Sequence, residues 1–361
     1  AGSARLIKAL LAVSRGVLPP NGQFETLSKN HNLDQSSLYI IEEAKPWEPG
    51  EGRSRKAGIS SYGFGGINYH MLIEQMTDHY ETVPRLIFTD TEYDFNDDRI
   101  VFAGLGVFLP GAGNCDEFWE KLQTGEKQLS VIPSEHFDND AYASQAKDSN
   151  YYLPKVKAGV VTDYKFENLK YRMPPKMVKS IERGQLFGLE AANEAIENSG
   201  LAQLLQPGNR AGAILGTISG ERQSKNIVRV RKQLVANMIR SCGALAENKR
   251  GVLADELVDQ IRARIPENNE DTTPGLLSNL ISGRITNFFG LNGANYVIDA
   301  SCASATIAIR NAARSIAFKD MDYALAGGVD TNLYPAVLMA FKRLGLLSEG
   351  DCNFFDSRAD G

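Results

Sequence analysis

Apolar and polar positions follow two different periods along this chain. Short apolar runs that end in Gly, Pro or Asp predict buried strands, at residues 99–111, 211–216, 294–300 and 321–330. Between them, apolar residues recur at every third or fourth position and predict helices, at residues 115–126, 174–200, 221–265, 272–290 and 301–318. Because strands and helices alternate, we expect an α/β protein with a mainly parallel sheet that helices cover on both faces.

The first 76 residues predict a similar mixture. Residues 1–18 have a helical pattern that stops at Pro19 and Pro20. Residues 37–47 predict a short strand closed by a turn, and residues 59–75 are Gly-rich at first and then alternate as a strand. Residues 77–98 are acidic and have no clear period, so we expect a linker there. After it, the pattern restarts like the N-terminus of a new domain.

Charge and cysteine use restrict the class of protein. A net charge of −5 argues against a nucleic-acid backbone or an anionic membrane surface as the main partner. No run approaches the roughly 20 apolar residues that span a bilayer. The four cysteines lie far apart, without the spacing of metal ligands, so we expect no metal site and no disulfide framework. We therefore expect a cytoplasmic protein.

One cysteine stands out by its surroundings. In VIDASCASATIAI, Cys302 lies between a predicted strand and a predicted helix, among small residues. Unpaired N–H groups at a helix N-terminus favour a thiolate, and small neighbours leave room for a thioester to approach. A small buried cysteine in a tightly packed turn would give the same pattern, because free cysteine is among the most buried residue types. Both interpretations stay open at this point.

Several stretches resemble one family in one order. DASCASA resembles the active-site element of β-ketoacyl synthases, the condensing enzymes of fatty-acid and polyketide assembly. Residues 99–138, 183–201 and 325–361 are similar to other N-terminal segments of the same domain. Residues 1–20 and 55–75 instead resemble its C-terminal end. The sequence thus resembles the ketosynthase domains of polyunsaturated fatty acid synthases and polyketide synthases.

This resemblance implies an incomplete thiolase-like condensing-enzyme fold, with layered, parallel-rich sheets and helices. It implies that residues 1–76 are the C-terminal end of a first ketosynthase domain, that residues 77–98 are an acidic linker, and that residues 99–361 are the N-terminal part of a second domain. It also implies a homodimer, or a pair of a ketosynthase and a chain-length factor.

The resemblance also implies site residues. Cys302 would take the acyl group from a thioester and then condense it with a malonyl group on an acyl carrier protein. The phosphopantetheine that carries both groups belongs to that partner, so we expect no cofactor on this chain. Phe64 and Gly65 of GFGG would form the oxyanion hole and gate, and Phe341 would line the acyl pocket. A strand-bounding turn at GFGG and core packing of Phe341 are the alternatives. Whether Phe64 and Cys302 meet within one chain stays open.

The histidines bear on activity. In the family, two histidines promote decarboxylation, and the resemblance places them between the ADG motif at the end of this sequence and the AGSA helix at its start. His31, His70, His79 and His136 do not match those places, so we expect that this chain alone does not complete the condensation. The alternative is a non-catalytic chain-length factor that shapes the acyl tunnel of a partner. A thiolase that degrades acyl-CoA is a weaker third alternative.

Overall fold

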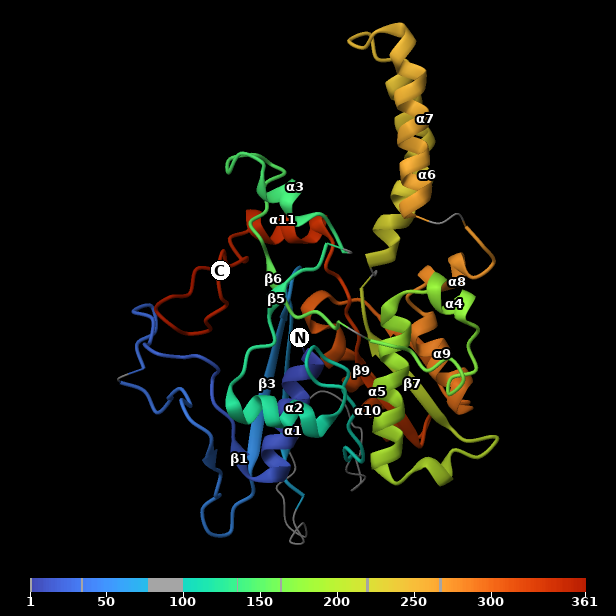
Figure 1. Ribbon diagram of the computed structural model, residues 1–361. Coiled ribbons are helices and arrows are strands. Elements are labelled where there is room, and N and C mark those ends of the chain that lie inside the picture. Colours follow the sequence, from blue (N-terminus) through green and yellow to red (C-terminus); the bar gives the residue numbers. More distant parts are fainter. Residues whose placement is uncertain are drawn as a thin grey trace.

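The computed structural model describes residues 2–361 apart from residues 34, 77–99, 135, 163, 219–220 and 266–267. The predicted linker and His79 therefore lie outside the described residues. The strands (Figure 1) are β1 Val17–Leu18, β2 Lys45–Pro46, β3 Lys56–Gly63, β4 Ile67–Glu74, β5 Ser130–Val131, β6 Lys157–Ala158, β7 Ala211–Gly216, β8 Asn295–Ile298 and β9 Tyr323–Gly328. The helices are α1 Gly2–Arg15, α2 Cys115–Thr124, α3 Asn139–Ala143, α4 Pro175–Ser180, α5 Arg183–Ser199, α6 Glu221–Arg240, α7 Glu247–Arg264, α8 Thr272–Leu276, α9 Leu280–Phe289, α10 Ser304–Ala317 and α11 Pro335–Arg343, with 3₁₀ turns η2 Ala202–Leu204 and η3 Ser301–Ala303.

The centre of the structure is a three-stranded parallel sheet in the order β8-β7-β9. All six residues of β7 are buried, as its uninterrupted apolar run predicts. Ala211, Ala213 and Leu215 pack with α5 and α9 on one face. Ile214 packs with α10 on the other face. The predicted parallel sheet with helices on both faces is therefore confirmed.

A second element lies beside this sheet. Strands β3 and β4 form an antiparallel hairpin of eight residue pairs, from Lys56↔Glu74 to Gly63↔Ile67. Gly65 and Gly66 in its turn have φ of +91° and +83°, which other residues rarely adopt. Ile59 and Ile73 on the inner face form a core cluster with residues of α1 and α10. The first 76 residues thus pack directly on the helix that follows the cysteine.

Residues 37–47 are not the strand that we predicted. Only Lys45–Pro46 forms a strand, β2, which pairs with β1. Leu38 and Tyr39 are 69% and 62% exposed. An apolar run becomes a strand only where a neighbouring strand takes its backbone groups and a core covers its side chains, and this run has neither along most of its length.

The predicted strand at residues 99–111 is also wrong over its described part. Residues 101–108 have no ladder, and only Leu109 forms a single bridge, with Ala112. Backbone N–H groups of this segment instead donate hydrogen bonds to polar side chains of α5. Glu194 Oε2 accepts from the Val107 N–H at 2.7 Å, and Asn198 Oδ1 accepts from the Leu105 N–H at 2.9 Å. The segment is therefore an extended strap along a helix.

Two glycines make this close contact possible. A Cβ on Gly104 would lie 2.2 Å from the carbonyl oxygen of Ala195, and one on Gly106 would lie 1.9 Å from that of Ala191. Both distances are far below van der Waals contact. The backbone of α5 thus requires the GLG sequence that begins at Gly104.

Two predicted helices are each divided. The pattern at residues 174–200 forms α4 and α5, because Ile181 between them is fully buried with extended backbone (φ −98°, ψ 157°). Helix α5 ends at Gly200 with φ of +69°, the left-handed cap that its sequence predicts. Residues 272–290 likewise form α8 and α9. The Nε2 amide of Gln185 donates to the carbonyl oxygens of Pro274, Gly275 and Leu277, and so joins α5 to the break before α9.

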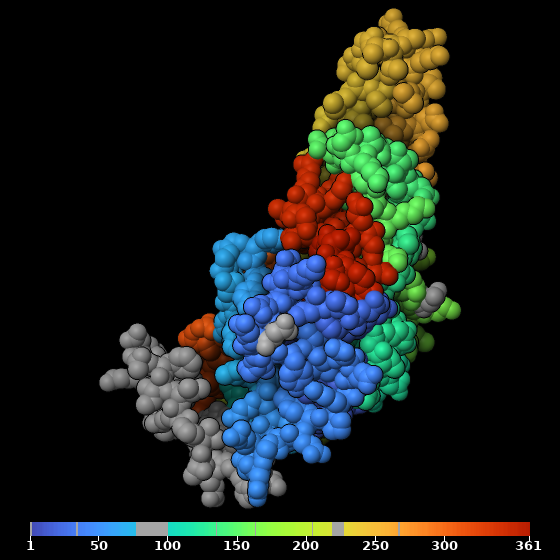
Figure 2. Space-filling view, turned by 90° about the vertical axis from the view of Figure 1, so that its left-hand side faces the viewer, coloured from blue at the N-terminus to red at the C-terminus, as the bar shows by residue number. Residues whose placement is uncertain are grey.

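Residues 221–265 are helical as predicted, with a turn at residues 241–246 between α6 and α7. The two helices form a hairpin that projects from the rest of the protein (Figures 1 and 2). A narrow seam of Ala236, Ala254 and Val258 holds them together.

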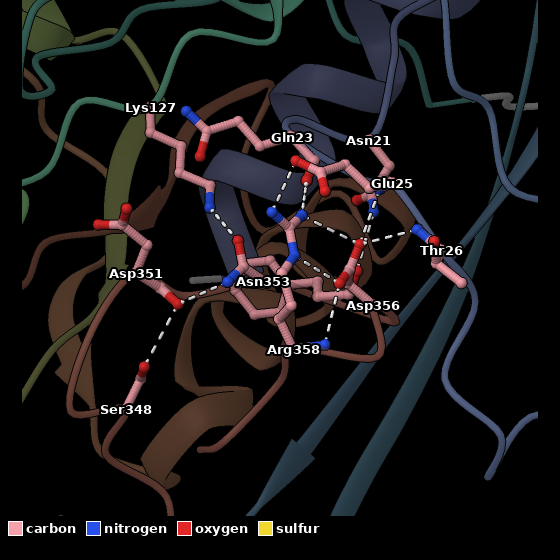
Figure 3. A network of polar contacts seen from close by, with 11 residues as sticks. Asn21, Gln23, Glu25, Thr26, Lys127, Ser348, Asp351, Asn353, Asp356 and Arg358 are labelled. Atoms are coloured by element: carbon pink, nitrogen blue, oxygen red, sulfur yellow. Dashed lines mark hydrogen bonds and ion pairs between the residues drawn. The ribbon is translucent and has the colours of Figure 1, made fainter.

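A buried carboxylate joins the two ends of the described chain (Figure 3). Asp356 is 1% exposed, and its Oδ2 accepts from the backbone N–H groups of Glu25 at 2.7 Å and Thr26 at 3.1 Å. The guanidinium of Arg358 donates to Asp356 and also to the carbonyl oxygen of Gln23. Hydrogen bonds from Arg358 and from backbone N–H groups hold the pKa of Asp356 far below its usual range.

We expect Gly106→Ala to destabilise the protein by at least about 2 kcal/mol, because the new methyl group displaces the strap from α5. Gly113→Ala is the matched control, since the nearest atom to its Cβ would lie at 3.7 Å, and we expect a change within about 0.5 kcal/mol. Urea unfolding of both variants measures this. Equal stability of the two variants would contradict the close packing of the strap on α5.

We expect Asp356→Asn to lower stability at pH 7. An unfolded aspartate has a pKa of about 3.9, and the folded pKa is lower, so the carboxylate contributes stability above about pH 4 that is lost as the pH falls further. The deficit of the variant should therefore shrink between pH 7 and about pH 3 in urea titrations. Asp351→Asn is the control, because Asp351 is a half-exposed carboxylate paired with Lys157. This variant should show a much smaller loss of stability at pH 7.

Candidate active site

Cys302 lies in the short turn that joins the sheet to a helix. Strand β8 ends at Ile298, η3 contains the cysteine, and α10 begins at Ser304. Cys302 is exposed, whereas Ala303 beside it is fully buried. This exposure does not fit the alternative of a small buried core cysteine. It leaves the thiol accessible next to the N-terminus of α10.

The turn has an unusual backbone that specific hydrogen bonds hold. Ser301 has φ of +54°, a left-handed conformation that costs energy in a residue with a Cβ. The Ser304 hydroxyl donates to the Ser301 carbonyl oxygen at 2.6 Å and accepts from the Ala300 N–H at 2.8 Å. Asp299 Oδ1 accepts from the Ser301 N–H at 3.1 Å. Sequence reasoning missed these supporting residues, although Ser and Asp near a helix start are a signal for such bonds.

The β3–β4 hairpin meets this turn within the same chain. The hydroxyls of Ser61 and Thr306 share a hydrogen bond of 2.8 Å and are 2% and 3% exposed. A Cβ on Gly63 would lie 2.9 Å from the Ala300 carbonyl oxygen. The residue before Phe64 thus lies against the turn that contains Cys302. The sequence alone had left open whether these two segments meet within one chain.

Phe64 and Phe341 lie together. Their ring centroids are 6.1 Å apart with an interplanar angle of 32°. Phe64 is 54% exposed, and Phe341 is half-buried on α11. Gly65 follows in the exposed turn of the hairpin. The structure therefore gathers Phe64, Gly65 and Phe341 on the side of the molecule where β3 meets the cysteine turn.

A cavity of about 510 Å³ lies elsewhere, between α1, α5, β9 and the strap, and Cys302 does not line it. Its walls include Gly104, Gly106, Ala191 and Ala195. Phe341 does not line it either. The cavity is therefore separate from the predicted acyl pocket.

The other cysteines have different surroundings, and all four are free thiols. Burial, with the Glu194 carboxylate as a second cause, raises the pKa of Cys115 to about 12. Burial also raises the pKa of Cys352. Cys242 is partly exposed and lies at the tip of the α6–α7 hairpin.

Two of the described histidines, His70 and His31, have contacts with residues other than Cys302. The register pairs Ser60 with His70, and the Ser60 hydroxyl is 2.9 Å from His70 Nδ1. Because side chains alternate along a strand, this pair faces the side opposite to Ser61, and Ser61 is the residue that contacts α10. The His31 ring packs edge-on against Phe355, with 5.5 Å between centroids.

Among the residues that the structure describes, no three His, Cys, Asp or Glu side chains are grouped so that they could hold a metal ion. Within the same residues, every helix is too short or too polar to cross a bilayer.

Comparison with known proteins gives one consistent result. The family model for the N-terminal domain of β-ketoacyl synthases matches residues 97–361. A polyunsaturated fatty acid synthase polypeptide of Thraustochytrium sp. is 27% identical over 267 residues, which cover 73% of this chain and 9% of that protein. A phenolphthiocerol/phthiocerol polyketide synthase polypeptide of Mycobacterium tuberculosis is also 27% identical, over 73% of this chain and 11% of that protein. The chain thus spans about a tenth of the length of these relatives.

Solved structures agree on the fold. The ketosynthase from module 6 of the bacillaene synthase of Bacillus subtilis 168 is similar with a TM-score of 0.52 and 23% identity, over 72% of this chain and 37% of that chain. The oxazolomycin ketosynthase domain of Streptomyces albus gives a TM-score of 0.50 at 19% identity, over 69% of this chain and 38% of that one. The predicted thiolase-like condensing-enzyme fold is therefore confirmed.

We expect iodoacetamide at about pH 7.5 to label Cys302 at least about tenfold faster than Cys115 and Cys352, because both of those thiols are shielded and have raised pKa values. Peptide mapping by mass spectrometry after short reaction times measures the three rates. Cys302→Ala is the control that should remove the fast label from the peptide that contains position 302 and leave the label on the Cys242 peptide unchanged. Labelling of Cys352 at the rate of Cys302 would contradict the assignment.

Proposed function

The chain belongs to the β-ketoacyl synthase family, and from this premise we propose that Cys302 is the acyl-accepting nucleophile of a condensing domain. The observation that carries the proposal is an exposed thiol in the turn between β8 and α10, with Gly63, the residue before Phe64, against that turn. The reaction class is acyl transfer, followed by decarboxylative Claisen condensation in fatty-acid or polyketide biosynthesis.

The proposed first step is transfer of an acyl group to the Cys302 thiol. The Cys302 thiolate attacks the carbonyl carbon of an acyl thioester on a carrier protein, and a new C–S bond forms. The bond to the phosphopantetheine sulfur breaks, and that sulfur leaves as a thiolate that takes up a proton. The amides of Cys302 and Phe64 are the proposed donors to the oxyanion. Phosphopantetheine is thus supplied by the partner and is not held by this chain.

The chemistry of the site supports each role. Ala300 and Ala303 beside Cys302 are small, so the flanking side chains leave room for a planar thioester. Hydrogen bonds from Ser304 fix the turn, which keeps the thiol in one place during attack. Phe64 packs on Phe341, which supports the proposal that the two rings shield the acyl chain from water as gate and pocket wall.

The histidine geometry supports a division of the reaction. His70 faces away from the helix that follows Cys302, and His31 packs on Phe355, so we propose that neither promotes decarboxylation. The condensation step then needs groups other than these. The chain-length-factor alternative makes the opposite prediction for the first step, because a scaffold does not need to accept an acyl group.

We expect an acyl N-acetylcysteamine thioester to acylate Cys302, seen as a mass increase on the peptide that contains this residue. Addition of a malonyl thioester should give no β-ketoacyl product. Cys302→Ala should abolish the adduct, and Cys352→Ala, the control, should leave it unchanged. Absence of any adduct on a folded protein would favour the scaffold alternative, and a β-ketoacyl product would refute the division of steps.

A further inference from the structure

The α6–α7 hairpin has an apolar stripe on the outer side of α6. We define the outer stripe as Ile227, Val230, Leu234 and Met238. At 100° per residue, these four side chains fall within about 80° of arc around the helix. Ala236, the α6 residue in the seam with α7, lies about 180° from Ile227. The outer stripe therefore faces away from α7.

The side chains of the outer stripe are open to solvent. Their exposed fractions are 49%, 67%, 58% and 63% in chain order. Single exposed apolar residues are ordinary on a protein surface, but four in a row along one helix form a continuous apolar surface that marks a binding site. The hairpin projects from the rest of the protein, which leaves this surface accessible to a large partner (Figures 1 and 2).

Helix α6 is also strongly basic. It contains six Lys or Arg residues and a single acidic residue, Glu221. Arg231 is exposed and lies beside the outer stripe, about 40° from Ile227 around the helix. A long arginine side chain can lay its methylene groups on an apolar surface and keep its charge at a polar boundary. Apolar and basic side chains in this arrangement are typical of a helix that lies on an anionic lipid surface.

The acidic residues of the chain do not oppose this attraction. Helix α7 carries four acidic and four basic side chains, so its charges balance. It packs on the far side of α6, about 8–10 Å further from any surface that the outer stripe touches. Charges are screened over about 8 Å at physiological ionic strength. The net charge of −5 belongs to the whole chain, so the local charge of α6 has the larger effect at the stripe.

The shape of the outer stripe favours a lipid surface over a protein partner. The stripe is a convex ridge on one helix, and α6 contains no aromatic residue. Protein interfaces depend strongly on large anchors, often Trp or Tyr, that fill a shaped pocket. The boundary between lipid headgroups and acyl chains accepts an apolar ridge without a matching shape.

We propose that the outer stripe binds an anionic lipid surface, with α6 in the plane of the surface and α7 above it. The apolar side chains enter the boundary between headgroups and acyl chains, and the basic side chains attract the negative headgroups. Because one helix supplies the contact, the binding is weak and reversible. This inference is independent of the chemistry of Cys302.

The test compares two Val→Asp substitutions in the full chain. Val230→Asp changes the outer stripe, whereas Val252→Asp changes a valine of α7 that is equally exposed, at 68% against 67%. Both substitutions change the net charge by the same amount, so a difference between them reports position alone. Circular dichroism should show equal helix content in the parent and both variants.

The parent chain should co-sediment with vesicles of phosphatidylcholine and phosphatidylserine at about 0.1 M salt, and bind at least about tenfold more weakly to phosphatidylcholine alone. Binding should weaken as the salt rises to about 0.5 M, because screening increases. We expect V230D to weaken binding at least about tenfold and V252D to change it by less than about twofold.

Three results of the vesicle experiment would overturn the proposal. One is a folded parent chain that does not bind the vesicles with phosphatidylserine. The second is equal binding to neutral and anionic vesicles, which would remove the role of the basic residues. The third is an equal effect of the two substitutions, which would place the contact elsewhere. If the parent binds no vesicles but self-associates in sedimentation velocity, and V230D weakens that association, the stripe would be assigned to a second copy instead.

Discussion

The close approach of β3, β7 and β9 to the start of α10 is the constraint on which the candidate site depends. A Cβ on Gly216 at the end of β7 would lie 2.4 Å from the Ala305 nitrogen, and one on Gly328 at the end of β9 would lie 2.8 Å from the Ala305 side chain. From the other side, Ser61 bonds to Thr306. Because no larger side chain fits between these elements, the N-terminus of α10 is held at the carboxyl edge of the sheet, where parallel sheets place their ligands.

Patterns within a single segment predicted the parts of the structure that depend on that segment alone. The apolar run of β7 indicated full burial, and the left-handed cap at Gly200 was predicted from the glycine itself. The strap at residues 101–108 has the same apolar pattern as a strand, but Glu194 and Asn198 take its backbone groups. Those two residues are some 90 positions away in sequence, so periodicity within the strap carries no information about them. Long-range competition for backbone hydrogen bonds is thus where sequence reasoning failed.

The candidate site was predictable to different degrees. The place of Cys302 between a strand and a helix followed from periodicity, whereas Phe64 and Phe341 entered only through a resemblance to a family. Their contact joins β3–β4 to α11, elements almost 280 positions apart, and no spacing rule indicates it. The Ser61–Thr306 hydrogen bond was missed for the same reason, because single hydroxyls on two amphipathic elements have no sequence signal for each other.

Cys302 is exposed, and its sulfur takes no part in the following contacts that hold the turn. The hydrogen bonds that hold the turn come from Ser304 and Asp299, and the buried atoms of the turn belong to Ala300 and Ala303. None of these contacts uses the sulfur, so an alanine at position 302 would keep the same geometry. Cysteine is ordinarily retained where it is buried, or where its thiol reacts. Since this thiol fills no space in the core, packing does not account for it, and this supports the proposal that it acts as a nucleophile at the N-terminus of a helix.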